Sequence, residues 1–166
     1  MLTSLLKLFK ALNSEQNAGQ LAMALSLSAI LGLTPLYSLH NILILLIVFS
    51  FRVNLSLFFL SYPLFAFIGY LLSDVFESVG LNVLQTPYLI DMWQSFFNTI
   101  IGRWSNFYYS GVIGSLLVAL VTAIIIYPLS KRLINLYRDK LLVKIEEYHL
   151  VKMLKASAFW KLYEQS

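Results

Sequence analysis

The chain contains 166 residues, of which 59% are hydrophobic and only 12% are charged, and its mean hydropathy is +0.76. This balance is typical of a membrane protein and excludes an ordinary soluble domain or a disordered chain. The absence of cysteine excludes disulfide bonds and thiolate ligands or nucleophiles, and the net charge of +4 favours contact with anionic surfaces.

The first predicted element is an amphipathic helix over 1–13, which would lie in the membrane surface. A long run without any charge follows, and Gly32 and Pro35 divide it into two apolar segments, 17–33 and 36–51. Each has about 16 residues and thus about 24 Å of helix, which is less than the roughly 30 Å of a hydrocarbon core. Two such segments form either thin transmembrane helices or a re-entrant hairpin, and the sequence leaves both open.

A third membrane segment is predicted over 53–72, where Pro63 would kink the helix. An amphipathic interfacial helix is predicted over 86–102, a last membrane segment over 107–129, and an amphipathic helix over 131–163. The expected fold class is therefore an all-α integral membrane protein, with about four membrane segments in a single domain.

The distribution of basic residues predicts the topology. Eight of the twelve lysines and arginines lie in the tail 131–166, which is therefore expected in the cytoplasm together with the N-terminus. The loop 73–106 then faces the opposite side of the membrane. No cleavable signal sequence is expected, because no small-residue cleavage site precedes a polar domain.

Catalytic patterns are absent from the sequence. It has no nucleophile elbow, phosphate-binding glycine loop or zinc-hydrolase motif, so neither an enzyme nor a cofactor or metal site is expected. His40 and Asn41 lie at membrane depth, where an ionisable residue such as His40 is a candidate site. His40 is nevertheless more often an interior hydrogen-bonding residue than a proton relay. Asp74 and Glu77 are most simply a solvated segment end. The basic tail is expected to meet anionic lipid and not nucleic acid, because an apolar stripe runs between its charges.

Small residues recur every four positions in two of the predicted membrane segments. Such rows allow close helix packing, either within the chain or against another subunit. One row lies in the last segment, and two lie in the first, formed by Ala18, Ala22 and Ser26 and by Ala24, Ser28 and Gly32. The candidate contacts for lipid or a partner are Pro35, His40, Asn41, Trp93, Phe97, Trp104 and the row Gly111, Ser115, Ala119 and Ala123.

Four short motifs carry a resemblance to a known family: Asn13-Ser14, Gln20-Leu21-Ala22, Gly32-Leu33-x-Pro35 and Arg52-Val53-Asn54. The region resembles a family of small uncharacterised inner-membrane proteins, found in bacteria that have an outer membrane. Members of that family are encoded as a two-gene pair with a large AsmA-like envelope protein. The resemblance implies a bacterial inner-membrane location, with 73–106 in the periplasm, and a role beside a long periplasmic lipid carrier.

Three functions are compatible with these observations. The first is a non-enzymatic subunit that anchors the AsmA-like protein and passes phospholipid to it between the inner and outer membranes. The second is a small homo-oligomeric transporter or channel, with His40, Asn41, Asp74 and Glu77 along a polar route. The third is a membrane scaffold without a transport role.

Overall fold

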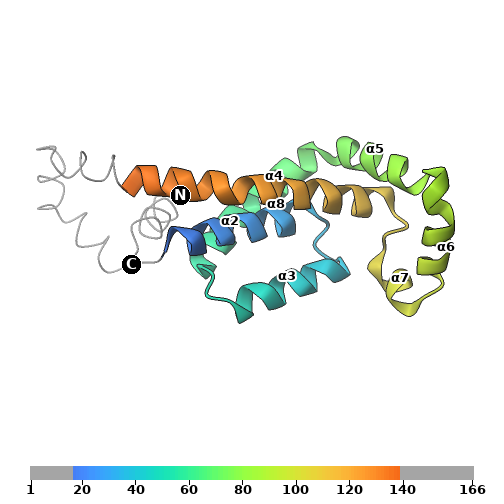
Figure 1. The fold of residues 1–166 in the computed structure, drawn as a ribbon, viewed down its shortest axis with the longest axis horizontal. Coiled ribbons are helices and arrows are strands. Elements are labelled where there is room, and N and C mark those ends of the chain that lie inside the picture. The colour runs from blue at the N-terminus through green and yellow to red at the C-terminus, as the bar shows by residue number, and fades with distance from the viewer. Residues whose placement is uncertain (1–16, 139–166) are drawn as a thin grey trace, which may run out of the picture.

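A computed structural model of the chain describes residues 17–138. Over these residues the structure is entirely helical, apart from turns and short linkers (Figure 1). The elements are α2 (Ala18–Leu33), α3 (Leu39–Ser50), α4 (Leu55–Leu71), α5 (Ser73–Leu84), the 3-10 turn η1 (Pro87–Leu89), α6 (Ile90–Phe97), α7 (Ile100–Ser105) and α8 (Ser110–Leu136).

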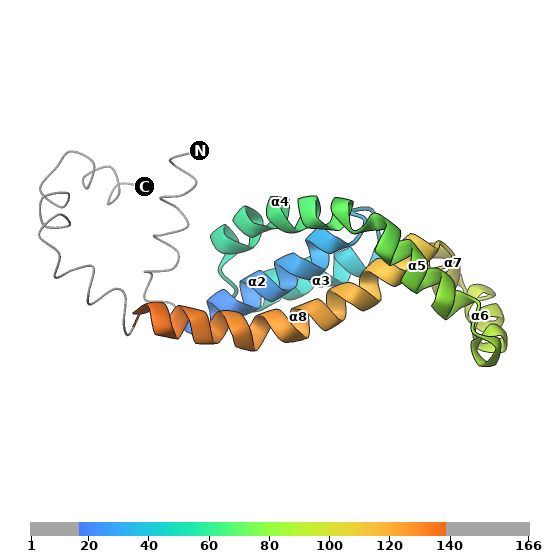
Figure 2. The same cartoon turned by 90° about the horizontal axis from the view of Figure 1, so that it is seen from above.

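Helix α2 lies at the centre of the bundle, with α4 on one side and α8 on the other (Figure 2). Helix α3 packs more sparsely against α2, and α5 packs along the first half of α8. The start of α2 and the end of α8 lie at the same end of the molecule, whereas α6 and α7 lie at the opposite end (Figure 1).

The central helix is built from small and apolar residues. It begins at Asn17, whose side chain accepts a hydrogen bond from the Gly19 amide, and it ends before Thr34 and Pro35, where the backbone becomes extended. Its interior polar groups are paired: Ser28 Oγ donates to the Phe58 carbonyl oxygen at 2.9 Å. The α2–α4 contact therefore contains a hydrogen bond as well as packed carbon atoms.

Glycines bring the helix backbones into direct contact at two crossings. A Cβ atom added at Gly69 would lie 3.0 Å from the Gly32 carbonyl oxygen, where α4 crosses the end of α2. A Cβ at Gly114 would overlap the Phe76 carbonyl oxygen, where α5 crosses α8. Because the neighbouring atoms belong to the backbone, neither crossing has room for a side chain.

The helix bounds refine the predicted segments. The all-α class is confirmed over the described residues, and one helix there, α8, is long and apolar enough to cross a membrane. Helices α4 and α5 pass the same test only as a pair, which bends by 68° at the break between them. Helix α4 continues through Pro63, so the break follows the proline-containing helix. Helices α2 and α3 are apolar but shorter, with 16 and 12 residues.

Two predicted segments differ in detail from the helices of the structure. The single helix over 86–102 is interrupted, because Thr99 Oγ1 donates to the Phe96 carbonyl at 2.7 Å and accepts from the Gly102 amide at 2.9 Å. A side chain that bonds the backbone in this way ends one helix and starts another. Helix α8 runs from Ser110 to Leu136, so it continues from the predicted membrane segment 107–129 into the region predicted as an amphipathic helix. The predicted helix over 1–13 and most of that over 131–163 lie outside the described residues.

Candidate functional site

The linker between α2 and α3 is held by Asn41, which is only 2% exposed. Its Nδ2 donates to the carbonyl oxygens of Pro35 at 2.8 Å and Leu36 at 3.3 Å. Its Oδ1 lies 3.0 Å from the hydroxyl of Thr34, which also reaches the Ile30 carbonyl at 2.8 Å. Asn41 therefore satisfies the backbone groups that the break between the helices leaves unpaired.

His40 is placed differently from its neighbour Asn41. Its ring stacks on Phe107 with 6.0 Å between centroids, and both ring nitrogens are buried without a hydrogen-bond partner among the described residues. Phe107 stacks in turn on Phe96, which touches both Trp93 and Phe97. These rings connect the first turn of α3 to α6, so the predicted contacts His40, Trp93 and Phe97 belong to one aromatic cluster.

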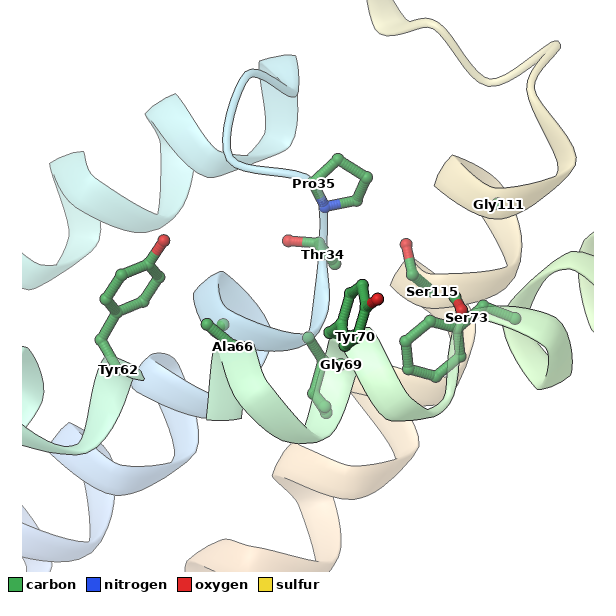
Figure 3. Close-up of a pocket in the computed structure, with 12 residues that line it drawn as sticks. Thr34, Pro35, Tyr62, Ala66, Gly69, Tyr70, Ser73, Gly111 and Ser115 are labelled. Atoms are coloured by element: carbon green, nitrogen blue, oxygen red, sulfur yellow. The ribbon is translucent and has the colours of Figure 1, made fainter. Parts of the chain in front are cut away.

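A cavity of about 320 Å³ opens where the end of α2 meets α4 and the first turns of α8 (Figure 3). Gly32, Gly69 and Gly111 contribute backbone to its wall. The remaining lining residues come from α2, the linker after it, α4, α5 and α8, and are Leu33, Thr34, Pro35, Tyr62, Ala66, Tyr70, Ser73, Phe76 and Ser115.

The chemistry of this cavity is apolar with hydroxyl groups and no charge. Thr34 and Ser115 use their hydroxyl protons on backbone carbonyls. The hydroxyls of Tyr62, Tyr70 and Ser73 make no hydrogen bond within residues 17–138 and remain free to donate. The cavity therefore suits an apolar ligand that carries a few uncharged hydrogen-bond acceptors.

A second cavity, of about 360 Å³, lies on the other part of the same linker. It is lined by Leu36, Tyr37, Ser38, Leu39 and Ile42, together with Trp104 and Asn106 from the end of α7. Trp104 is 74% exposed and Tyr37 is 93% exposed. The first half of the linker, Thr34 and Pro35, therefore lines the first cavity, and the second half, residues 36–38, lines the second cavity.

Large apolar side chains cover much of the surface of the bundle. Ile124 on α8 is 73% exposed, and large aliphatic and aromatic side chains are exposed along α3, α4 and α8. The buried positions hold apolar residues, such as Leu21 and Phe58, together with serine, threonine and asparagine. A soluble protein exposes few contiguous apolar patches, so this arrangement is typical of a surface that meets lipid.

The small-residue rows face the interior of the chain. The row Ala24, Ser28 and Gly32 meets α4, and Ser115, Ala119 and Ala123 are buried. Gly111 is the exception in its row, because a Cβ atom added there would find nothing within 4 Å. Most of this row therefore packs within the chain, and its first position opens into the first cavity.

The other predicted residues are dispersed. Asp74 and Glu77 are exposed on α5, and residues 17–138 contain no cluster of three or more histidines, aspartates or glutamates that could hold a metal ion. Gln20 is half-buried, Arg52 is exposed, and Asn54 is buried and caps α4 by accepting from the Leu57 amide at 2.7 Å. Asn13 and Ser14 lie outside the described residues.

Several cavity residues were not predicted from the sequence, namely Tyr62, Gly69, Tyr70 and Ser73. They come from α4 and the first residue of α5. The glycine pair Gly32 and Gly69 was the available signal, since both lie near the ends of apolar helices.

The chain is similar to bacterial proteins that are described as uncharacterized. A family model described as "Uncharacterized protein conserved in bacteria (DUF2062)" matches residues 5–141. An uncharacterized protein of Treponema pallidum (strain Nichols) is 28% identical over 145 residues, which cover 87% of this chain and 90% of that protein. No solved structure matches the chain significantly.

Proposed function

The chain belongs to the DUF2062 family, and from this premise and the geometry of the bundle we propose that it is a non-enzymatic subunit of the bacterial inner membrane. In this proposal it anchors a large AsmA-like periplasmic protein and helps to pass phospholipid between the inner and outer membranes. Both termini lie in the cytoplasm, and the loop 73–106 lies in the periplasm.

The observation that supports the membrane assignment most strongly is the apolar surface of the bundle. Isoleucine, leucine and phenylalanine cover much of its outside, while the buried polar groups of Ser28 and Asn41 are hydrogen-bonded inside it. Exposing those side chains to water would cost about 25 cal/mol per Å² of apolar surface. A bilayer removes this cost, and α8 is long enough to cross it.

The short helices support a role with lipid. Helix α2 is about 24 Å long and α3 about 18 Å, both less than the roughly 30 Å of a hydrocarbon core. A bilayer adapts to short helices by thinning around them. A thinned region lowers the distance over which a lipid headgroup must pass through hydrocarbon, which favours movement of lipid beside the protein.

The AsmA-like partner rests on the family resemblance of the motifs in α2 and the following linkers. Its seat is proposed at the periplasmic end, where the second cavity and the exposed Trp104 offer apolar surface. Small residues inside the bundle are already used for packing within the chain, so they are not the seat.

The test is affinity purification of the tagged protein from gently solubilised membranes, followed by mass spectrometry of proteins and lipids. Recovery of a large periplasmic protein together with phospholipid is the expected result. Recovery of the chain in the soluble fraction would contradict the membrane assignment. A purified homo-oligomer that conducts ions or solutes in liposomes without any partner would favour the transporter instead.

A further inference from the structure

We propose that the first cavity, between Gly32, Tyr70 and Gly111, binds the glycerol-ester region of a diacyl phospholipid. The inference deepens the proposed function and rests on the chain being embedded in a membrane. It assigns a ligand to a specific place in the bundle, which the role of a membrane subunit does not require.

The depth of the cavity matches the position of lipid ester groups. Gly111 and Ser115 lie in the first two turns of α8, and the first basic residue of that helix is Lys131. The 20 residues from Gly111 to Lys131 span about 30 Å, which equals the thickness of a hydrocarbon core. When Lys131 lies at one membrane boundary, the cavity therefore lies at the other, where the acyl chains of lipids join their glycerol.

The groups that line the cavity fit an uncharged oxygen acceptor. The hydroxyls of Tyr62, Tyr70 and Ser73 are free to donate, and an ester carbonyl can accept from them. No lysine or arginine lines the cavity, whereas a bound phosphate would be expected to meet one. The ester region is therefore a better match than the phosphate of the same lipid.

The cavity is large enough for only part of a phospholipid molecule. Its volume of about 320 Å³ is at the lower end of the roughly 300–1,000 Å³ of ligand pockets. The glycerol-ester part fits, and the acyl chains must continue outside. Phe67 and Leu71, which are exposed beside Tyr70 on α4, provide an apolar surface along which they can run.

Gly111 offers a way to block the cavity without disturbing the fold. A Cβ atom added there meets nothing within 4 Å, so Gly111→Leu would place its side chain in open space that the cavity occupies. Gly111→Ala adds a single methyl group at the same position and is the matched control. Both changes favour the helix, so loss of lipid would not reflect loss of folding.

The experiment uses full-length protein in vesicles of phosphatidylethanolamine and phosphatidylglycerol that contain a phosphatidylethanolamine with a diazirine next to its acyl ester. After irradiation, mass spectrometry locates the cross-linked residues. We expect cross-links at Tyr62, Ala66 or Tyr70, and the yield there should fall about tenfold in Gly111→Leu but no more than about twofold in Gly111→Ala. Cross-links at Ile124, on the outside of α8, should remain in all variants.

The outcomes separate this inference from the proposed function. Cross-links at Ile124 without any in the cavity, or cavity cross-links that survive Gly111→Leu, would overturn the lipid site and leave the membrane assignment intact. Absence of cross-links at both places would overturn both.

An ether-linked phospholipid, which lacks ester carbonyls, tests the chemistry. In competition with the probe it should bind the wild-type cavity about fivefold more weakly than the ester lipid does. The triple variant Tyr62→Phe, Tyr70→Phe and Ser73→Ala, which lacks all three free hydroxyls, should bind the two lipids equally. Equal binding by the wild-type protein would refute recognition of the ester.

Discussion

Two glycines lie three positions apart on α8, and the same substitution should change the free energy of unfolding in opposite directions at the two positions. Gly111→Ala and Gly114→Ala each add one methyl group and each raise helix propensity by up to about 1 kcal/mol. At Gly111 the methyl group enters open space. At Gly114 it would overlap the Phe76 carbonyl oxygen and lie 2.7 Å from the Gly80 amide nitrogen.

The loss of stability expected for Gly114→Ala depends on which atoms must move to make room for the methyl group. Both obstructing atoms belong to the backbone of α5, so the overlap is relieved only when α5 moves away from α8. Overpacking of this kind costs about 1–3 kcal/mol, and the lost helix–helix contacts add to it. We therefore expect Gly114→Ala to lower the free energy of unfolding by about 1–3 kcal/mol, while Gly111→Ala leaves it unchanged or raises it by up to about 1 kcal/mol.

The measurement is reversible unfolding in mixed micelles of detergent and sodium dodecyl sulfate, followed by circular dichroism. Gly80→Ala, which would overlap the Ser110 carbonyl from the other side of the same crossing, should resemble Gly114→Ala. If Gly114→Ala unfolds at the same point as the wild-type protein or later, the two backbones are not in contact. The packing of α5 on α8 would then be wrong.

Further predictions concern the linker, the tip of α7 and the topology. Asn41→Leu removes the two hydrogen bonds that Nδ2 donates to the linker and the contact of Oδ1 with the Thr34 hydroxyl, and should lower the free energy of unfolding by about 2–4 kcal/mol in the same assay. Thr34→Val should lower it by about 1 kcal/mol, and equal losses would contradict the central role of Asn41. Trp104 can be kept as the single tryptophan by changing the other two to phenylalanine. Brominated lipids in vesicles should quench its fluorescence, because its side chain is 74% exposed beside apolar surface. Quenching only by aqueous iodide would place α7 in water. Because the chain has no cysteine, the variants Asn98→Cys and Asn135→Cys each carry a single site for a thiol label. A membrane-impermeant maleimide should react only with Asn98→Cys in intact spheroplasts. Labelling of both variants or of neither would refute the proposed topology.

The helix class and several helix ends could be predicted because their signals are local. Pro35 stops α2 shortly before it, and a change from apolar to polar residues near Arg52 stops α3. Helix α5 was not predicted, because Asp74 and Glu77 were interpreted only as an exit from the membrane. Their carboxylates instead lie on the exposed face of a helix whose other face packs on α8.

The cavity could not be predicted in the same way. Its wall depends on the bend between α4 and α5 and on the angle at which α2 approaches the first turns of α8. These are tertiary features, and residues such as Tyr62 and Tyr70 look like ordinary lipid-facing aromatics in the sequence. The interior hydrogen-bonding role that was expected of His40 is instead filled by its neighbour Asn41, since both ring nitrogens of His40 lack a partner among the described residues.

The position of α2 between α4 and α8 affects how the protein is made. Helix α2 leaves the ribosome well before α8, which is one of the two helices that cover it. Until α8 has been synthesised, the side of α2 that α8 covers in the finished bundle must be shielded by lipid or by the insertion machinery. We therefore expect a chain cut before Ser110 to be degraded in cells, since the bundle closes only when α8 enters the membrane.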